Sequence, residues 1–294
     1  MHKDEQKGQH PHRKLIIIGG AEDRDDECEI LQEFVRAAGG ADARIALMTV
    51  ATSMPLEAAA VYRKTFGKLG VQNAEIVDVG SRKDVNLPES MRFLETATGI
   101  FFTGGDQLHI TSLLGGSDMQ ELIRKRYEEG VALAGTSAGA AMMTSSMIIR
   151  GESDCSPRCG GLEIGPGMNI LQDAVIETHF SQRGRFGRLL AAVAHYPQNI
   201  GYGIDENTAL VLHEDEVRVI GQNSVTVVDA SHITYTNLPE LRDGDALTLH
   251  NVRVHVLSRG QAFNWREREP VELDARRKSA RTRPETRDQP QAHR

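Results

Sequence analysis

The residues with the clearest chemical potential lie in the segment 135–139, Gly-Thr-Ser-Ala-Gly. It fits the pattern G-x-S-x-G, an elbow that places a serine on a tight turn between a strand and a helix. An apolar run at 131–134 precedes it and helix-forming residues at 140–143 follow it. The N-terminus of that helix would favour negative charge near the Ser137 oxygen. We therefore predict a serine hydrolase with Ser137 as nucleophile; the alternative is a packing turn with a buried serine.

A serine hydroxyl becomes a useful nucleophile only when a base takes its proton. His179 closes the strand-like segment 174–180 and is our candidate base. The histidines that we expect instead on the surface or in packing positions are His109, His195, His213, His232, His250 and His255. A carboxylate must orient the imidazole, and Asp205 and Glu206 are both candidates because they follow a glycine-rich strand end. The chain order serine, histidine, acid differs from that of α/β-hydrolases.

A hydrolase of this kind also needs two donors for the developing oxyanion. The backbone N–H of Ala138 is one candidate, and the glycine turn that ends in Gly105 can supply the second. The other glycine pair, at 19–20, does not continue as G-x-G-x-x-G, so we expect no dinucleotide site and no cofactor. The three cysteines lack further ligands at metal-site spacing, and we expect no metal.

The elements that must position these residues follow from the hydrophobic pattern. Short apolar runs at 15–18, 45–48, 76–79 and 100–102 alternate with two helical patterns, at 30–35 and 58–69. Unbroken runs of this length are typical of a parallel sheet covered on both faces. After about Gly201 the pattern changes to β-branched strands at 208–212, 217–220, 225–228 and 252–257, which favour antiparallel additions to the edge of the sheet.

The fold class that this predicts is α/β, with a mostly parallel sheet flanked by helices and extra antiparallel strands in the C-terminal third. We expect a disordered segment at 1–13, a single α/β domain at 14–270 and a basic, disordered tail at 271–294. The formal net charge of -7 argues against general nucleic-acid binding. The first residues lack the apolar segment of a secretory signal, and no apolar run reaches the length of a spanning helix. We therefore expect a cytoplasmic protein without membrane association.

The motifs in combination resemble the cyanophycinase family of serine peptidases, family S51. They occur in the same order at 19–23, 102–108, 134–140, 179–185 with Arg188, and 203–206. The resemblance implies a flavodoxin-like fold of the class I glutamine amidotransferase type, with serine in place of cysteine, and a homodimer. It implies an exopeptidase that releases β-Asp-Arg dipeptides from cyanophycin, a poly-aspartate that carries arginine on each β-carboxylate. It also implies a triad of Ser137, His179 and Glu206.

The resemblance further places four residues in a substrate groove: Gln107, Arg183, Arg185 and Arg188. Carboxylates of the substrate call for guanidinium partners, and Arg185 and Arg188 share a face if a helix begins near Gly184. The alternative is that these arginines form an ordinary solvated helix face. Arginines of the substrate need acceptors, for which Glu177 and Gln107 are available.

One departure from the family pattern concerns the two residues before the candidate base. The family often has Asp-Gln there, whereas this chain has Glu177 and Thr178. Glutamate keeps the charge, but threonine loses the two donors of the amide, which bears on affinity and register along the polymer. Two alternative functions therefore remain: a dipeptidase for small aspartyl peptides, and a non-catalytic relative that binds the polymer.

Overall fold

The structure is a computed structural model that describes residues 14–271. The predicted disordered segment 1–13 and the predicted basic tail, apart from Val271, lie outside the described residues. The helices of the described part are α1 (Glu29–Ala37), α2 (Pro55–Lys68), α3 (Pro88–Thr96), α4 (Gln107–Leu114), α5 (Asp118–Glu128), α6 (Ala138–Ala141) and α7 (Phe186–His195). Short 3₁₀ helices occur at η1 (Gly40–Asp42), η2 (Asp84–Asn86), η3 (Ser181–Arg183) and η4 (Leu238–Glu240).

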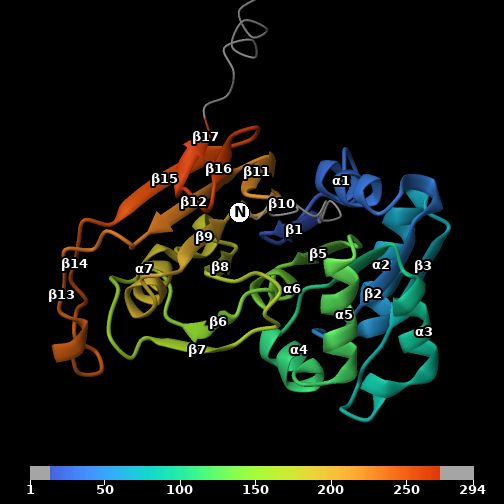
Figure 1. The fold of residues 1–294 in the computed structure, drawn as a ribbon, viewed down its shortest axis with the longest axis horizontal. Helices are drawn as coiled ribbons and strands as arrows, with labels where there is room; N and C mark the ends of the chain where they lie inside the picture. Colours follow the sequence, from blue (N-terminus) through green and yellow to red (C-terminus); the bar gives the residue numbers. More distant parts are fainter. Residues whose placement is uncertain (1–13, 272–294) are drawn as a thin grey trace, which may run out of the picture.

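A nine-stranded mixed sheet runs through the described chain (Figure 1). Its order is β17 (Glu269–Val271), β16 (Ala262–Asn264), β11 (Glu216–Gly221), β10 (Thr208–His213), β1 (Lys14–Ile18), β5 (Ala132–Thr136), β4 (Gly99–Phe102), β2 (Arg44–Met48), β3 (Asn73–Val77). The strands from β1 to β3 in this order pair in parallel, and the strands from β10 to β17 add antiparallel to the β1 edge. The predicted parallel sheet with antiparallel additions is confirmed.

A second, four-stranded sheet has the order β15 (Arg253–Ser258), β12 (Ser224–Asp229), β9 (Ile200–Ile204), β8 (Ala174–Thr178). The strands β8 and β9 are parallel, and β12 and β15 continue antiparallel. The prediction that all late strands extend the edge of the main sheet is therefore wrong for β12 and β15. Hydrophobic alternation identifies a strand but not its partner. Here β12 pairs with β9, and Val228 of β12 packs with Leu189 and Val193 of α7, a contact between distant segments that the pattern does not display. Two hairpin-like pairs complete the strands: β6 (Ser146–Gly151) with β7 (Leu162–Pro166), and β13 (Tyr235–Thr236) with β14 (Leu249–His250).

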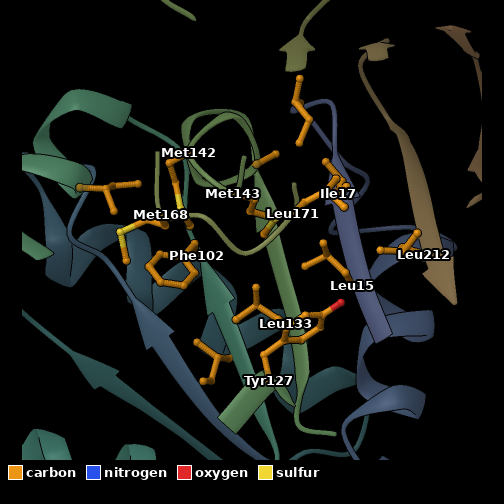
Figure 2. Close-up of a cluster of buried hydrophobic side chains, with 14 of the residues drawn as sticks. Leu15, Ile17, Phe102, Tyr127, Leu133, Met142, Met143, Met168, Leu171 and Leu212 are labelled. Atoms are coloured by element: carbon orange, nitrogen blue, oxygen red, sulfur yellow. The ribbon is translucent and has the colours of Figure 1, made fainter. Parts of the chain in front are cut away.

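Helices cover both faces of the parallel part of the main sheet. Alternate residues of each strand point to opposite faces, so each strand contributes side chains to two separate cores. On one face Ile16, Ile18 and Leu47 belong to a core with residues of α1 and α2. On the other face Leu15, Phe102 and Leu133 pack with residues of α5 and with Met142 and Met143, which directly follow α6 (Figure 2). Burial on both faces explains why these strands appear in the sequence as unbroken apolar runs.

The carboxyl ends of three strands bring the chemistry together. Ser137 follows β5 of the main sheet, His179 follows β8 of the second sheet, and Glu206 comes two residues after β9. The candidate site therefore lies where the two sheets meet. Such an edge is where ligands bind in open α/β folds.

Candidate active site

Ser137 occupies a strained turn between β5 and α6. Its backbone has φ 54° and ψ -113°, a conformation that non-glycine residues rarely adopt. A Cβ at Gly135 would overlap the carbonyl of Gly139, and a Cβ at Gly139 would overlap the carbonyl of Phe102. The two glycines of the motif are thus required by close packing, and the turn holds the half-buried Ser137 side chain at the end of the sheet.

A hydrogen-bonded relay connects Ser137 to an acid. Ser137 Oγ lies 2.8 Å from His179 Nε2, and His179 Nδ1 lies 2.7 Å from Glu206 Oε1. The structure therefore brings together the three residues that the resemblance implies as a triad. An Nδ1–H that donates to the carboxylate leaves Nε2 as an acceptor for the serine proton.

The choice between the two candidate acids follows from their contacts. Asp205 is buried, and its oxygens accept hydrogen bonds from Ser181 and Ser224: from the Ser181 N–H at 2.9 Å and from the Ser224 hydroxyl at 2.9 Å. The Glu206 side chain is 35% exposed and faces the imidazole. Asp205 thus joins the start of η3 to β12, and Glu206 is the residue in contact with the base.

Residues 18–20, at the end of β1, accept backbone hydrogen bonds from the three loops that carry the relay. The carbonyl of Ile18 accepts from Ser137 N at 3.0 Å, that of Gly19 from His179 N at 2.8 Å, and that of Gly20 from Asn207 N at 2.9 Å. Three successive carbonyls of one segment therefore fix the loops that carry the nucleophile, the base and the acid.

The glycines of this segment are required by space. A Cβ at Gly19 would overlap the carbonyl of Asp205, and a Cβ at Gly20 would overlap the imidazole of His179. Gly20 also has φ 101°, a conformation that favours glycine. The glycine pair at 19–20 is thus part of the framework around the candidate base.

The electrostatic environment of His179 favours its neutral form. Burial lowers the pKa of His179 below its usual value, and the positive charges of Arg183 and Arg185 lower it further, although the hydrogen bond to Glu206 raises it. A base must be unprotonated to accept a proton. The imidazole is therefore suited to that role down to pH values below those of an ordinary histidine.

The two candidate oxyanion donors belong to α6 and to the loop after β4. Ala138 is the first residue of α6, so its N–H has no acceptor within the helix. The loop that ends in Gly105 is fixed by Asp106 N, which donates to the Ala51 carbonyl at 2.8 Å. A Cβ at Gly104 would lie 3.4 Å from the Cβ of Ser137, so this loop packs directly on the nucleophile.

The residues predicted for the substrate groove divide into two groups. Arg183 ends η3, is exposed and lies close enough to affect the pKa of His179. Gln107 is half-buried on α4, and its Nε2 donates to the carbonyls of Ile148 at 2.9 Å and Ile149 at 3.1 Å. The amide nitrogen of Gln107 is therefore engaged with β6, which leaves its oxygen as the group open to a substrate.

The second group forms a buried ion cluster. Glu177 is 3% exposed, and its oxygens lie 2.7 Å from Arg185 Nη1 and 2.9 Å from Arg188 Nε. Arg185 Nη1 also donates to the carbonyl of Thr178, which is itself buried, at 2.8 Å. Glu177 therefore contacts arginines of its own chain where we expected it to face a guanidinium of the substrate. Arg188 lies on α7 and Arg185 immediately precedes it, as the expected helix near Gly184 requires.

The site has a second wall, which the sequence motifs alone did not predict. A pocket of about 270 Å³ opens beside Ser137 and His179, and residues from the segment after β1 and from α2 line it, among them Glu22, Arg24 and Tyr62. Glu22 and Arg24 lie in or next to the 19–23 motif, which was one available signal. Tyr62 lies inside a predicted helix, where the sequence alone offers no reason to separate it from other core residues.

Residues 14–271 contain no group of three or more His, Cys, Asp or Glu side chains arranged to hold a metal ion. In the same part of the chain, no helix combines the length and apolar character needed to cross a membrane. The three cysteines are free, with Cys28 buried.

The chain is similar to known proteins over most of its length. Residues 15–220 match the model of peptidase family S51. The chain is 38% identical over 265 residues to a protein named cyanophycinase from Geminocystis herdmanii, covering 90% of this chain and 97% of that protein. It is 38% identical to a cyanophycinase from Trichormus variabilis, covering 86% of each. It is 37% identical to one from Synechococcus elongatus, covering 87% of this chain and 80% of that protein.

Solved structures share the fold at lower identity. A peptidase from an acI-B1 actinobacterium superposes with a TM-score of 0.63 at 22% identity, covering 87% of this chain and 98% of that chain. A putative peptidase E protein from Listeria monocytogenes has a TM-score of 0.50 at 16% identity, covering 72% and 100%. These two structures share with this chain the arrangement of the sheet and its helices.

Proposed function

The chain belongs to peptidase family S51 and is a peptidase, and from this premise we propose that it acts as a cyanophycinase, a serine exopeptidase that releases β-Asp-Arg dipeptides from cyanophycin. The observation that carries the reaction type is the relay from Ser137 through His179 to Glu206, with contacts of 2.8 Å and 2.7 Å. The substrate is supported by the curated relatives, which are named cyanophycinase and match along nearly their whole length.

The proposed first half-reaction forms an acyl-enzyme. His179 Nε2 takes the proton of Ser137 as the oxygen attacks the carbonyl carbon of an aspartyl backbone amide. The N–H of Ala138 and an N–H near Gly105 donate to the oxyanion. The protonated imidazole, held by Glu206, gives its proton to the leaving amine, and the C–N bond breaks.

The second half-reaction returns the enzyme to its starting state. His179 takes a proton from a water molecule, which attacks the ester carbonyl of the acylated Ser137. Collapse of this intermediate releases a carboxylate product, and His179 returns the proton to Ser137 Oγ. In each half-reaction His179 takes up one proton and gives it back, so the proton transfers balance with the residues of the chain and water alone.

The proposed substrate suits the positive groups near the relay. Each arginine of cyanophycin keeps a free carboxylate because it is joined through its amino group. Arg183 is exposed next to His179 and can bind such a carboxylate in a bidentate manner. Gln107 offers an amide oxygen to a guanidinium of the substrate. Four other residues do not contact the substrate in this proposal but hold the surrounding structure in place: Glu177, Thr178, Arg185 and Arg188.

The test compares the wild-type chain with Ser137→Ala on purified cyanophycin granules. We expect the wild type to dissolve the granules and the variant to leave them intact. An equal rate for the two proteins would refute the assignment of Ser137. Hydrolysis of small α-aspartyl dipeptides with no action on the polymer would favour the alternative dipeptidase, and binding of the polymer without turnover would favour the non-catalytic relative.

We propose further that the chain acts as a homodimer in the cytoplasm. The dimer is supported by the family resemblance of the sequence motifs. Sedimentation equilibrium of the purified chain would report a dimer mass, and a monomer at all concentrations would refute this part. Fractionation of source cells would test the location, and activity outside the cytoplasmic fraction would contradict it.

A further inference from the structure

The pocket beside Ser137 that is lined by Glu22, Arg24, Thr52 and Tyr62, here called the α2 pocket, has no role in the mechanism above. It has a volume of about 270 Å³ and reaches both Ser137 and His179. Its walls come from the segment after β1, the loop before α2, and α2 itself, together with Gly104. Arg183 is not among the residues that line this pocket, so the pocket can hold a part of the substrate other than the one that Arg183 binds.

Glu22 is a buried structural link in the wall of this pocket. It is 3% exposed, and its two oxygens accept hydrogen bonds from Tyr62 Oη and Thr136 Oγ1, both at 2.5 Å. Thr136 directly precedes the nucleophile. Glu22 therefore joins the wall formed by α2 to the strand that carries Ser137, and both lone-pair sides of its carboxylate are occupied.

Arg24 supplies the charge that a ligand would meet. Its guanidinium carbon lies 5.8 Å from the centre of the Tyr62 ring, and the residue is half-buried. Burial, and then the charge of Glu22, raise the pKa of Tyr62 well above its usual value, so the ring stays neutral and does not compete as an anion for Arg24. A guanidinium that is stacked on an aromatic ring is oriented in advance for bidentate contact with a carboxylate.

Arg24 differs from two other arginines near the site, Arg185 and Arg188, in its surroundings. Arg185 and Arg188 share the buried Glu177 carboxylate, at 2.7 Å and 2.9 Å, so both guanidinium groups are held in ion pairs within the chain. Arg24 is half-buried, and the apolar side chains of Ala58 and Val61 also line the α2 pocket. A charge-assisted hydrogen bond is stronger in such surroundings than in open solvent.

We propose that the α2 pocket is a substrate subsite in which Arg24 binds a free carboxylate of the unit next to the scissile amide. The inference rests on the proposed peptidase reaction at Ser137, because that reaction makes the space beside the serine a place for substrate. Arg24 would then favour substrates with a carboxylate at this position over their carboxamide counterparts.

The test measures how well a ligand protects Ser137 from a fluorophosphonate probe. The two ligands are the β-Asp-Arg dipeptide and the same dipeptide with both carboxylates converted to carboxamides. We expect the wild type to prefer the carboxylate ligand about 10-fold or more, the size of a charge-assisted hydrogen bond. In Arg24→Gln this preference should fall by about 5-fold or more, with the remainder due to Arg183, and Arg24→Lys should keep more of the preference than Arg24→Gln.

Arg63→Gln is the matched control. Arg63 is an exposed arginine of the same helix α2, and its Nε donates to the carbonyl of Ala74 at 2.8 Å, away from the α2 pocket. This variant should keep the wild-type preference. Three results would overturn the proposal: an unchanged preference in Arg24→Gln, no protection or no preference in the wild type, and an equal loss of protection by both ligands in Arg24→Gln, which would indicate a structural role.

Release of β-Asp-Arg from cyanophycin, measured on the same proteins, separates this inference from the proposed function. An Arg24-dependent preference without release from the polymer would support the subsite and refute the cyanophycinase assignment. Release by the wild type with the preference intact in Arg24→Gln would support the function and refute the subsite.

Discussion

At the scale of single residues, two adjacent carboxylates have different hydrogen-bond partners in the site. Asp205 and Glu206 are neighbours in the chain, yet Asp205 faces Ser181 and Ser224, and Glu206 faces His179. The chain reverses its side-chain direction between them because they follow the end of β9, where successive residues point to opposite sides. The two acids therefore have separable roles, one in folding and one in the relay.

Replacement of Glu206 by Gln should lower kcat without unfolding the protein. An amide cannot stabilise the imidazolium or hold the same tautomer, and an equivalent change in a serine triad costs about 10⁴ in kcat. The side chain is 35% exposed, so we expect a change in unfolding free energy of less than about 1 kcal/mol. Steady-state kinetics and thermal unfolding of the same preparation measure both effects. Near wild-type turnover would exclude Glu206 from the relay.

Replacement of Asp205 by Asn should show the opposite balance. Each of the hydrogen bonds that its buried carboxylate accepts is worth about 1.5–3 kcal/mol as a bond to a charged group, and the amide can satisfy only part of them. We expect a lower melting temperature and a kcat that falls less than in Glu206→Gln. A variant as stable as the wild type but without activity would mean that the two acids have been assigned the wrong way round.

The pH dependence of kcat/KM should report His179. Burial and the charge of Arg183 lower its pKa, so the acid limb should lie below the ordinary histidine value of 6.5. Arg183→Gln removes one of the positive charges, which should raise the pKa and move the acid limb to higher pH, whereas Arg183→Lys should leave it in place. Profiles of kcat/KM on a soluble peptide would measure the limb. A limb that stays fixed or moves to lower pH in Arg183→Gln would contradict this account.

At the scale of elements, the end of β1 organises the site. Its three carbonyls accept from the backbone of Ser137, His179 and Asn207, which belong to loops far apart in the sequence. The role explains why this turn is built from two glycines: a Cβ on either would overlap the loops that it holds. The orientation of His179 thus depends on the absence of side chains from the two residues that follow β1, a segment that itself carries no residue of the relay.

Gly20→Ala should therefore abolish the alignment of the relay. Its new Cβ would overlap the imidazole of His179, and the positive φ adds a backbone cost of about 1–2 kcal/mol. Gly39→Ala is the matched control, because Gly39 also has a positive φ, of 112°, but its Cβ would meet no atom within 4 Å. We expect both variants to lose stability and only Gly20→Ala to lose kcat by more than about 100-fold. Equal kcat values for the two would contradict the proposed role of the segment.

Prediction from the sequence worked best where local chemistry determines the structure. The runs at 15–18, 45–48 and 100–102 correspond to β1, β2 and β4, because burial on both faces leaves an unmistakable pattern. The elbow around Ser137 could be placed because its glycines are required by a turn within a few residues. The family resemblance then selected Glu206 over Asp205, a choice that spacing alone left open.

The remaining features depend on contacts between distant segments, which the sequence does not display. The bond from Tyr62 to Glu22 and the bond from Thr136 to Glu22 join three separate elements. Glu177 was expected to face the substrate because its charge was visible, but its burial against Arg185 and Arg188 depends on how α7 packs on β8. The division of the late strands between two sheets depends in the same way on tertiary packing.

At the scale of the whole molecule, the proposed catalytic relay is assembled where two sheets meet. The nine-stranded sheet supplies Ser137, and the four-stranded sheet supplies His179 and Glu206 through β8 and β9 (Figure 1). The relay exists only when both sheets are folded and docked, with the end of β1 between them. Folding and activity should consequently be lost together when either sheet is disrupted.

The measurement that tests the central claim most directly is the analysis of products after digestion of purified cyanophycin. The proposed exopeptidase reaction predicts that the wild-type chain releases β-Asp-Arg as the only soluble product, and that Ser137→Ala releases none. Mass spectrometry of the soluble fraction identifies the dipeptide, and its β linkage is established by NMR. Free arginine, long polymer fragments, or release that continues in Ser137→Ala would contradict the account.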